Sequence, residues 1–348
     1  MFRNGAFFWH PGRMPSGGST TTGLALARAK YALDAAGLAS NVELTRAQSV
    51  TNEVWLTPDH VVRVNRKADH RLRREALLGP VLPAEVKYPK VVAYGASSGF
   101  DWLIVGRSPG RPLSRCWPTM SDAQRRNAVR QLAGVLKSLH ATTAPDGLDD
   151  VGAPQLLESG TGQSPVAPLL AGLQRARALP NVGAGLVDQL TEIVRTTQSV
   201  LEPFDVPTLI HGDLTFENVL WDDDAIAGLI DFEWSRAAPP DLELDVLLRF
   251  CAFPELHVAD DYVDETAAQN YRVVPHWIRE HYLDLFTTRY ALERLRIYAI
   301  AFDVRQLLMS PPTAPLHDLP PSHELQRLHR VAQHRSYLDN FASGAEMI

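Results

Sequence analysis

Three polar residues with a regular spacing lie beside apolar, strand-like runs in the second half of the chain. Asp213 follows the run Thr208-Leu209-Ile210, Asn218 comes five residues after it, and Asp231 comes thirteen residues after Asn218. Metal-assisted phosphoryl transfer needs this set of groups: one carboxylate to orient a hydroxyl, and an amide oxygen with a second carboxylate to hold Mg²⁺. We therefore interpret Asp213 as the catalytic base and Asn218 and Asp231 as metal ligands.

A hairpin is expected to bring the two metal ligands together. Val219-Leu220-Trp221 and Gly228-Leu229-Ile230 have the pattern of its strands, and Asp222-Asp223-Asp224 that of its turn. Folding of this hairpin returns Asp231 to the neighbourhood of Asn218. Because Mg²⁺ completes its octahedron with water and phosphate oxygens, two protein ligands are enough.

The alternative for each of these residues is structural. Asp213 and Asn218 could form turns by bonding to their own backbone, and Asp231 could cap a strand end. We favour the functional interpretation because the spacing, the apolar strands and the third polar group would otherwise have to coincide by chance.

A second pair of charged residues lies upstream. Arg63 is enclosed by valines in a predicted strand, and Glu75 lies on the expected apolar face of a short predicted helix, Asp69 to Leu78. A charge on a buried face needs a partner, so we predict an Arg63–Glu75 ion pair that points the guanidinium at the α- and β-phosphates of a nucleotide. In the alternative, Arg63 lies along the surface and Glu75 pairs with Arg71 or Arg74 on its own helix.

The segment Gln48-Ser49-Val50-Thr51-Asn52 lies between two predicted strands, where a loop over the phosphates would be placed. It has no glycine, and neither a Gly-x-Gly-x-x-Gly motif nor a P-loop occurs in the chain. Backbone amides and the side chains of Ser49, Thr51 and Asn52 are the candidate phosphate contacts. A plain turn is the alternative.

The pattern of elements predicts an α+β protein with two lobes. Strand-like runs and the helix Asp69 to Leu78 indicate a small sheet in residues 40–105. The segment Gly106 to Pro112 is rich in residues that break regular structure, and we interpret it as the hinge between the lobes. We predict a flexible N-terminal arm (residues 1–22), a nucleotide-binding N-lobe (23–106), and a larger, mainly helical C-lobe with the catalytic loop, metal site and acceptor-binding helices (107–348).

Helical periodicity is strong beyond the hinge. Ser121 is a candidate cap for a helix whose face carries Val129 and Leu132, and we expect helices at Trp277 to Met309 and at Ser322 to Phe341.

Composition excludes several classes of function. The chain of 348 residues is 45% hydrophobic and 21% charged, with a net charge of −6, and it has no basic block for nucleic-acid phosphates. No apolar run approaches the roughly 18 residues of a membrane span. Only Cys116 and Cys251 are present, which is too few for a disulfide framework. We expect a cytoplasmic monomer or homodimer.

Three motifs lie within residues 211–245: His211-Gly212-Asp213-Leu214-Thr215-Phe216-Glu217-Asn218, Ile230-Asp231-Phe232-Glu233-Trp234 and Pro240-Asp241-Leu242-Glu243-Leu244-Asp245. Together they resemble the aminoglycoside phosphotransferase and choline kinase-like family, which has the bilobal protein-kinase-like fold. Looser similarity extends over Val61 to Glu75, so the likeness covers residues 40–310.

The resemblance implies the same roles for Asp213, Asn218 and Asp231, with Arg63 and Glu75 as the nucleotide anchor. It also implies that the hinge near Val105 and Arg107 receives adenine. Two features depart from the family pattern: Arg63 stands where many relatives carry Lys, and the phosphate loop lacks glycine.

A protein kinase is the rival within this fold. Only seven residues separate Asp231 from Pro239-Pro240, too few for an activation segment that must bind a peptide. A small-molecule acceptor is therefore preferred.

Candidate acceptor contacts are the acidic residues and an aromatic residue of the C-terminal region. Acids would suit a cationic aminoglycoside, and aromatic rings would suit a macrolide or nucleoside antibiotic; the alternative is a solvated acidic loop beside ordinary helix core. The candidates are Glu233, Asp260, Asp261, Asp264 and Trp277.

The sequence thus predicts an O-phosphotransferase that uses Mg²⁺ and ATP or GTP to phosphorylate a hydroxyl of a small molecule, preferably an antibiotic. One alternative is a metabolic kinase for a sugar, choline, ethanolamine or homoserine-like substrate. A second is a kinase-like module that binds a ligand without turnover.

Overall fold

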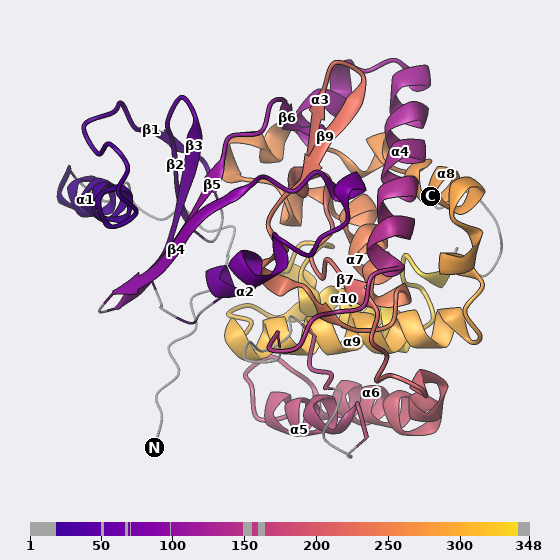
Figure 1. The fold of residues 1–348 in the computed structure, drawn as a ribbon. Helices are drawn as coiled ribbons and strands as arrows, with labels where there is room; N and C mark the ends of the chain where they lie inside the picture. The colour runs from indigo at the N-terminus through magenta and orange to yellow at the C-terminus, as the bar shows by residue number, and fades with distance from the viewer. Residues whose placement is uncertain are drawn as a thin grey trace.

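The N-terminal lobe is a five-stranded antiparallel sheet between two helices (Figure 1). Val62, Val64 and Ile104 face the N-terminal helix, whereas Leu103 and Val105 face the second helix with Leu72, as the alternation of side chains along a strand requires. The strand order is β1-β2-β3-β5-β4. The elements are α1 (Ser19–Ala35), β1 (Thr45–Ala47), β2 (Glu53–Leu56), β3 (His60–Asn65), α2 (Arg71–Leu78), β4 (Val91–Ser97) and β5 (Phe100–Gly106).

The computed structural model describes residues 19–49, 52–66, 69, 71–97, 99–148, 155–158 and 164–339. Of the expected N-terminal arm, residues 1–22, only Ser19 to Thr22 are described, and they form the start of α1. No helix within these ranges is long and apolar enough to cross a membrane.

The C-terminal lobe is mainly helical, with a single large hydrophobic core. In Figure 1, α9 crosses this lobe with α5 and α6 on one side of it. α7 packs against α9, and α10 packs against both α9 and α6. Its helices are α3 (Leu113–Cys116), α4 (Asp122–His140), α5 (Ala167–Ala176), α6 (Ala184–Thr197), α7 (Asp241–Ala252), α8 (Val274–His281), α9 (Ala291–Met309) and α10 (Glu324–Ala332). Its strands are β6 (Arg111–Pro112), β7 (Leu209–Ile210), β8 (Val219–Asp222), β9 (Ala225–Leu229) and β10 (Arg236–Ala237).

Two helices are shorter than the periodicity predicts. The expected helix from Trp277 to Met309 is broken between α8 and α9, where Tyr290 has a left-handed backbone (φ 59). The expected helix from Ser322 to Phe341 is also wrong in extent, because α10 ends at Ala332 and His334 is left-handed (φ 54). A left-handed residue interrupts the helical backbone, before α9 at Tyr290 and after α10 at His334, and side-chain periodicity does not report it.

The hinge segment docks on the C-terminal lobe. β5 ends at Gly106, and β6 pairs with β8. Gly110 between them has a φ of +87, and a Cβ atom there would lie 2.4 Å from the carbonyl oxygen of Trp221. Only glycine permits both this conformation and this close approach.

Candidate active site

The turn that carries Asp213 is fixed by its backbone. β7 pairs with β10, and Gly212, two residues after the end of β7, has a φ of +82. A Cβ atom at Gly212 would lie 2.3 Å from the carbonyl oxygen of Trp234. The glycine of this His-Gly-Asp segment therefore lets the turn pack against the segment that follows Asp231.

A buried carboxylate holds the same turn from below. Glu243, in the first turn of α7, accepts hydrogen bonds from the backbone amides of His211 (2.6 Å) and Gly212 (3.2 Å). The imidazole of His140 lies 3.8 Å from the Glu243 carboxylate. Although burial opposes ionisation, the neighbouring imidazoles of His140 and His211 hold the pKa of Glu243 below its ordinary value. A charged acceptor is thus maintained under the turn.

The expected hairpin is present, and Asn218 at its start is hydrogen-bonded to the residue before Asp231 and to the backbone of Asp213. β8 pairs with β9, and Asp223 and Asp224 form the turn with positive φ angles of 43 and 62. The amide of Ile230 donates to the carbonyl of Asn218 (3.0 Å), and the side-chain amide of Asn218 donates to the carbonyl of Asp213 (2.8 Å).

Asp231 leaves the hairpin in a left-handed conformation, with a φ of 68. The imidazole of His211 contacts the carbonyl of Ile230 at 2.9 Å, which ties the turn of Asp213 to the residue before Asp231. Asp213, Asn218 and Asp231 therefore belong to one hydrogen-bonded unit, although no side-chain hydrogen bond links the two aspartates in the described part of the chain.

The electrostatics of this unit favour a cation. Burial, together with the charges of Asp231 and Glu233, raises the pKa of Asp213 to about 7, whereas Arg249 opposes the shift. Carboxylate oxygens of Glu75, Asp231 and Glu233 all lie within 4.8 Å of one another. The cation beside all three carboxylates is the guanidinium of Arg63, and Arg71 adds a second positive charge at Glu233.

Arg63 joins the two lobes at this point. One nitrogen of its guanidinium donates to Glu75, and the other donates to Asp231 (2.6 Å). The hydroxyl of Tyr88 also donates to Glu75 (2.8 Å). The predicted Arg63–Glu75 pair is therefore formed, and Glu75 is not paired within its own helix. Burial raises the pKa of Glu75 to about 7, which Arg63 opposes.

Glu233 faces the N-terminal lobe. Its buried carboxylate accepts hydrogen bonds from Asn52 (3.0 Å) and Arg71 (3.2 Å), and it lies 3.7 Å from Arg63. The sequence places Glu233 among the acceptor contacts, but its partners come from the loop before β2, from α2 and from β3. Glu233 therefore links the segment after Asp231 to the N-terminal lobe.

The remaining candidates for nucleotide binding differ in their exposure and in their contacts. Ser49 is exposed, and Thr51 lies outside the described residues. Val105 is buried at the end of β5. Arg107 bonds the turn between β2 and β3, since its amide donates to Asp59 (2.8 Å) and its guanidinium donates to the carbonyl of Thr57 (3.0 Å). Its side chain thus has a structural contact in the hinge.

The other acceptor candidates do not converge on Asp213. Asp261 pairs with Arg115 (3.1 Å), and Asp260 and Asp264 are exposed. Trp277 is buried beneath the guanidinium of Arg126, which lies 4.9 Å from the ring centroid. No hydrogen bond or ion pair links these four candidates to Asp213 in the ranges that the structure describes.

Sequence reasoning missed two groups. Glu243 lies in the motif Pro240 to Asp245, but no function was predicted for it. An acid between Leu242 and Leu244 in an apolar helix indicates a buried partner. Arg71 was considered only as a neighbour of Glu75, yet it reaches Glu233 in the other lobe.

The chain belongs to the phosphotransferase enzyme family, whose sequence pattern matches residues 43–277. This match confirms the family that the motifs predict. Among curated proteins, the chain is 30% identical over 173 residues to an aminoglycoside 3'-phosphotransferase of Streptomyces ribosidificus. The matched region is 49% of this chain and 61% of that relative, so it spans about three fifths of the relative's length.

Solved structures confirm the predicted bilobal fold. A thermostable mutant of aminoglycoside phosphotransferase APH(4)-Ia, in a ternary complex with ADP and hygromycin B, is similar with a TM-score of 0.58 and 16% identity over 88% of this chain and 97% of that one. The gentamicin complex of APH(2")-IIa is similar with a TM-score of 0.56 and 17% identity, over 92% of this chain and 97% of that one.

Proposed function

We propose that the protein is a Mg²⁺-dependent O-phosphotransferase that transfers the γ-phosphate of ATP or GTP to a hydroxyl of a small molecule. The observation that carries the proposal is the single hydrogen-bonded unit formed by Asp213, Asn218 and Asp231, with Arg63 of the other lobe bonded to Asp231. Membership of the phosphotransferase enzyme family supports the same reaction class.

The residues present fit a magnesium ion. Asn218 and Asp231 would hold it, because both offer oxygen ligands and lie at the two ends of one hairpin. The carboxylates of Glu75, Asp231 and Glu233 supply the negative charge that a divalent cation neutralises. When bound, the ion would screen the negative charge of the nucleotide phosphates.

The other side chains of the site would orient the acceptor hydroxyl and bind the nucleotide. Asp213 would accept a hydrogen bond from the acceptor hydroxyl and orient its oxygen for in-line attack on the γ-phosphorus, taking the proton as the leaving diphosphate departs. Arg63 would exchange Asp231 for the α- and β-phosphates while it keeps Glu75. Asn52, now bonded to Glu233, would stand at the loop over the phosphates. The end of β5 near Val105 would receive the base.

The preferred acceptor is an antibiotic. The curated relative is named an aminoglycoside 3'-phosphotransferase, and two similar structures hold hygromycin B and gentamicin. A metabolic kinase for a sugar, an amino alcohol or a homoserine-like substrate is the alternative, because both would use the same base and metal ligands. A panel of antibiotics and metabolites with ATP and Mg²⁺, read by mass for an added phosphate, separates the two.

The test of the reaction class is Asp213→Asn, which keeps the shape of the side chain and removes the base. Transfer should fall by at least about 10²-fold, while stabilisation by nucleotide and Mg²⁺ in thermal melts is retained. Asp223→Asn, in the exposed turn of the same hairpin, is the matched control and should leave both readouts unchanged. Unchanged turnover in Asp213→Asn would refute the assignment.

A further inference from the structure

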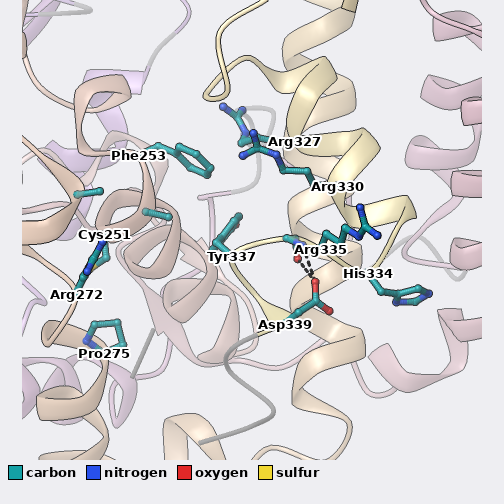
Figure 2. Close-up of a pocket in the computed structure, with 13 residues that line it drawn as sticks. Cys251, Phe253, Arg272, Pro275, Arg327, Arg330, His334, Arg335, Tyr337 and Asp339 are labelled. Carbon is teal, nitrogen blue, oxygen red and sulfur yellow. Dashed lines mark hydrogen bonds between the residues drawn. The ribbon is translucent and has the colours of Figure 1, made fainter. Parts of the chain in front are cut away.

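A cavity of about 470 Å³ lies at the far end of α7 from the candidate active site. One wall comes from the end of α7 (Cys251 to Phe253) and the residues around the start of α8, and the other from α10 and the segment after it (Figure 2). Figure 2 shows the side chains of Arg327 and Arg330 extending from α10 across the cavity toward Phe253, with Tyr337 between the walls. The volume lies within the usual range of small-molecule sites.

The lining is strongly basic in a chain of net charge −6. Arg272, Arg330 and Arg335 line the cavity, and among the described residues none of them has an acidic partner. Arg327 is different, because it pairs with Asp303 (2.5 Å). Asp339, the acid of the lining, is already bonded to Arg296. Three guanidinium groups are therefore available to a ligand.

Apart from His334 and Ser336, the rest of the lining is apolar or aromatic. The rings of Phe253 and Tyr337 meet edge to face with centroids 5.6 Å apart, and Cys251 and Pro275 are buried beside them. Guanidinium groups bind the paired oxygens of a phosphate or carboxylate with two parallel hydrogen bonds, and aromatic rings hold a flat apolar body. The same arginines repel a polycation.

We propose that this cavity binds a small organic anion, with a phosphate or carboxylate on the arginines and an apolar body against Phe253 and Tyr337. The ligand would be an effector and not the acceptor of the proposed phosphotransfer, because the cavity lies at the far end of α7 from Asp213. Binding itself does not depend on the proposed function.

Helix α7 connects the cavity to the candidate active site. Glu243 bonds the catalytic turn, and Cys251 follows eight residues later on the same helix, a distance of about 12 Å along its axis. Arg249, buried between them, lies 3.2 Å from Asp245. A ligand in the cavity would thus contact the end of the helix whose first turn supports Asp213.

The experiment is calorimetric titration of the full chain with 1-naphthyl phosphate, in the absence of nucleotide and Mg²⁺. Binding should weaken by about tenfold in Arg330→Gln and in Arg335→Gln, since each removes a charge-assisted hydrogen bond. Affinity should also fall as salt rises. Arg46→Gln, an exposed arginine on β1, is the matched control and should bind as the unmodified chain does. Thermal melts establish that each variant is folded.

Three outcomes would overturn the proposal: no binding, equal binding of uncharged 1-naphthol, or equal binding by the Arg330→Gln/Arg335→Gln double variant. Nucleotide affinity measured with and without saturating 1-naphthyl phosphate then tests the effector role. A shifted affinity supports an effector, and an unchanged affinity overturns that role. Because titration omits nucleotide, a failure of the proposed phosphotransfer leaves this result intact.

Discussion

Glu243 accepts a hydrogen bond of 2.6 Å from the backbone amide of His211, two residues before Asp213. The two residues are 32 positions apart, and the bond links the first turn of α7 to the turn that carries the proposed base. A buried carboxylate that accepts from two consecutive amides fixes the path of the backbone there.

Glu243→Gln should lower turnover more than nucleotide affinity. Glutamine keeps one acceptor oxygen but turns an NH₂ group toward the second amide, so one buried amide loses its partner, at a cost of about 1–3 kcal/mol. We expect a lower kcat, an almost unchanged KM for the nucleotide, and a lower free energy of unfolding by denaturant titration. Glu192→Gln, on the exposed face of α6, is the control. An unaltered kcat in Glu243→Gln would remove its positioning role.

Gly212→Ala should destabilise the protein and abolish activity. The new Cβ atom would lie 2.3 Å from a backbone carbonyl oxygen, at a φ of +82 that alanine rarely adopts. The expected loss is at least about 2 kcal/mol. Gly134→Ala in α4 has nothing within 4 Å of its Cβ, so it should stabilise the helix by up to about 1 kcal/mol. Equal stability of the two variants would contradict the account of the catalytic turn.

Arg63→Met should reveal how much of the Arg63–Glu75 pair is structural. It leaves Glu75 buried without its cation, which should lower the free energy of unfolding by about 3–5 kcal/mol. The double variant Arg63→Met/Glu75→Leu removes both charges and should recover most of this loss. Stabilisation by Mg²⁺ and ATP in thermal melts should remain absent in the double variant. If nucleotide stabilisation returned with the fold, Arg63 would have no part in binding the donor.

His257 should contribute to acid sensitivity. Burial, with the charges of Arg249 and Arg327, holds the pKa of His257 well below its ordinary value. Below pH of about 6.5, the unfolded chain therefore binds a proton that the folded chain does not, and stability falls as pH falls, by up to about 1.4 kcal/mol per pH unit. His257→Phe should flatten this slope in denaturant titrations between pH 6.5 and 5. Comparing slopes cancels a constant packing cost, and an identical slope would contradict the assignment.

The hairpin of the candidate site could be predicted because its information is local. Asn218 and Asp231 are separated by two short strands whose turn residues, Asp223 and Asp224, tolerate positive φ angles. Alternation of side chains sets the register of such a hairpin, so the meeting of its two ends follows from the sequence. The Arg63–Glu75 pair was equally accessible, since both are charges on apolar faces only 12 residues apart.

Contacts between distant elements could not be predicted in the same way. Asn52 and Glu233 are 181 residues apart, and no local sequence pattern in either segment predicts their contact. The basic cavity requires α7, α8 and α10 to meet, and α10 was expected to continue to Phe341. His334 turns the chain back instead and brings Arg335 and Tyr337 to the cavity. Left-handed residues and packing between helices carry little periodic signal.

The hydrogen bonds that join the turn of Asp213 to the hairpin of Asn218 and Asp231 all lie within the C-terminal lobe. Rotation of one lobe against the other would therefore move Arg63 and Asn52 relative to these three side chains, but would leave the spacing among the three unchanged. Lobe motion would govern when the donor arrives, whereas the geometry between base and ion is established once, as this lobe folds.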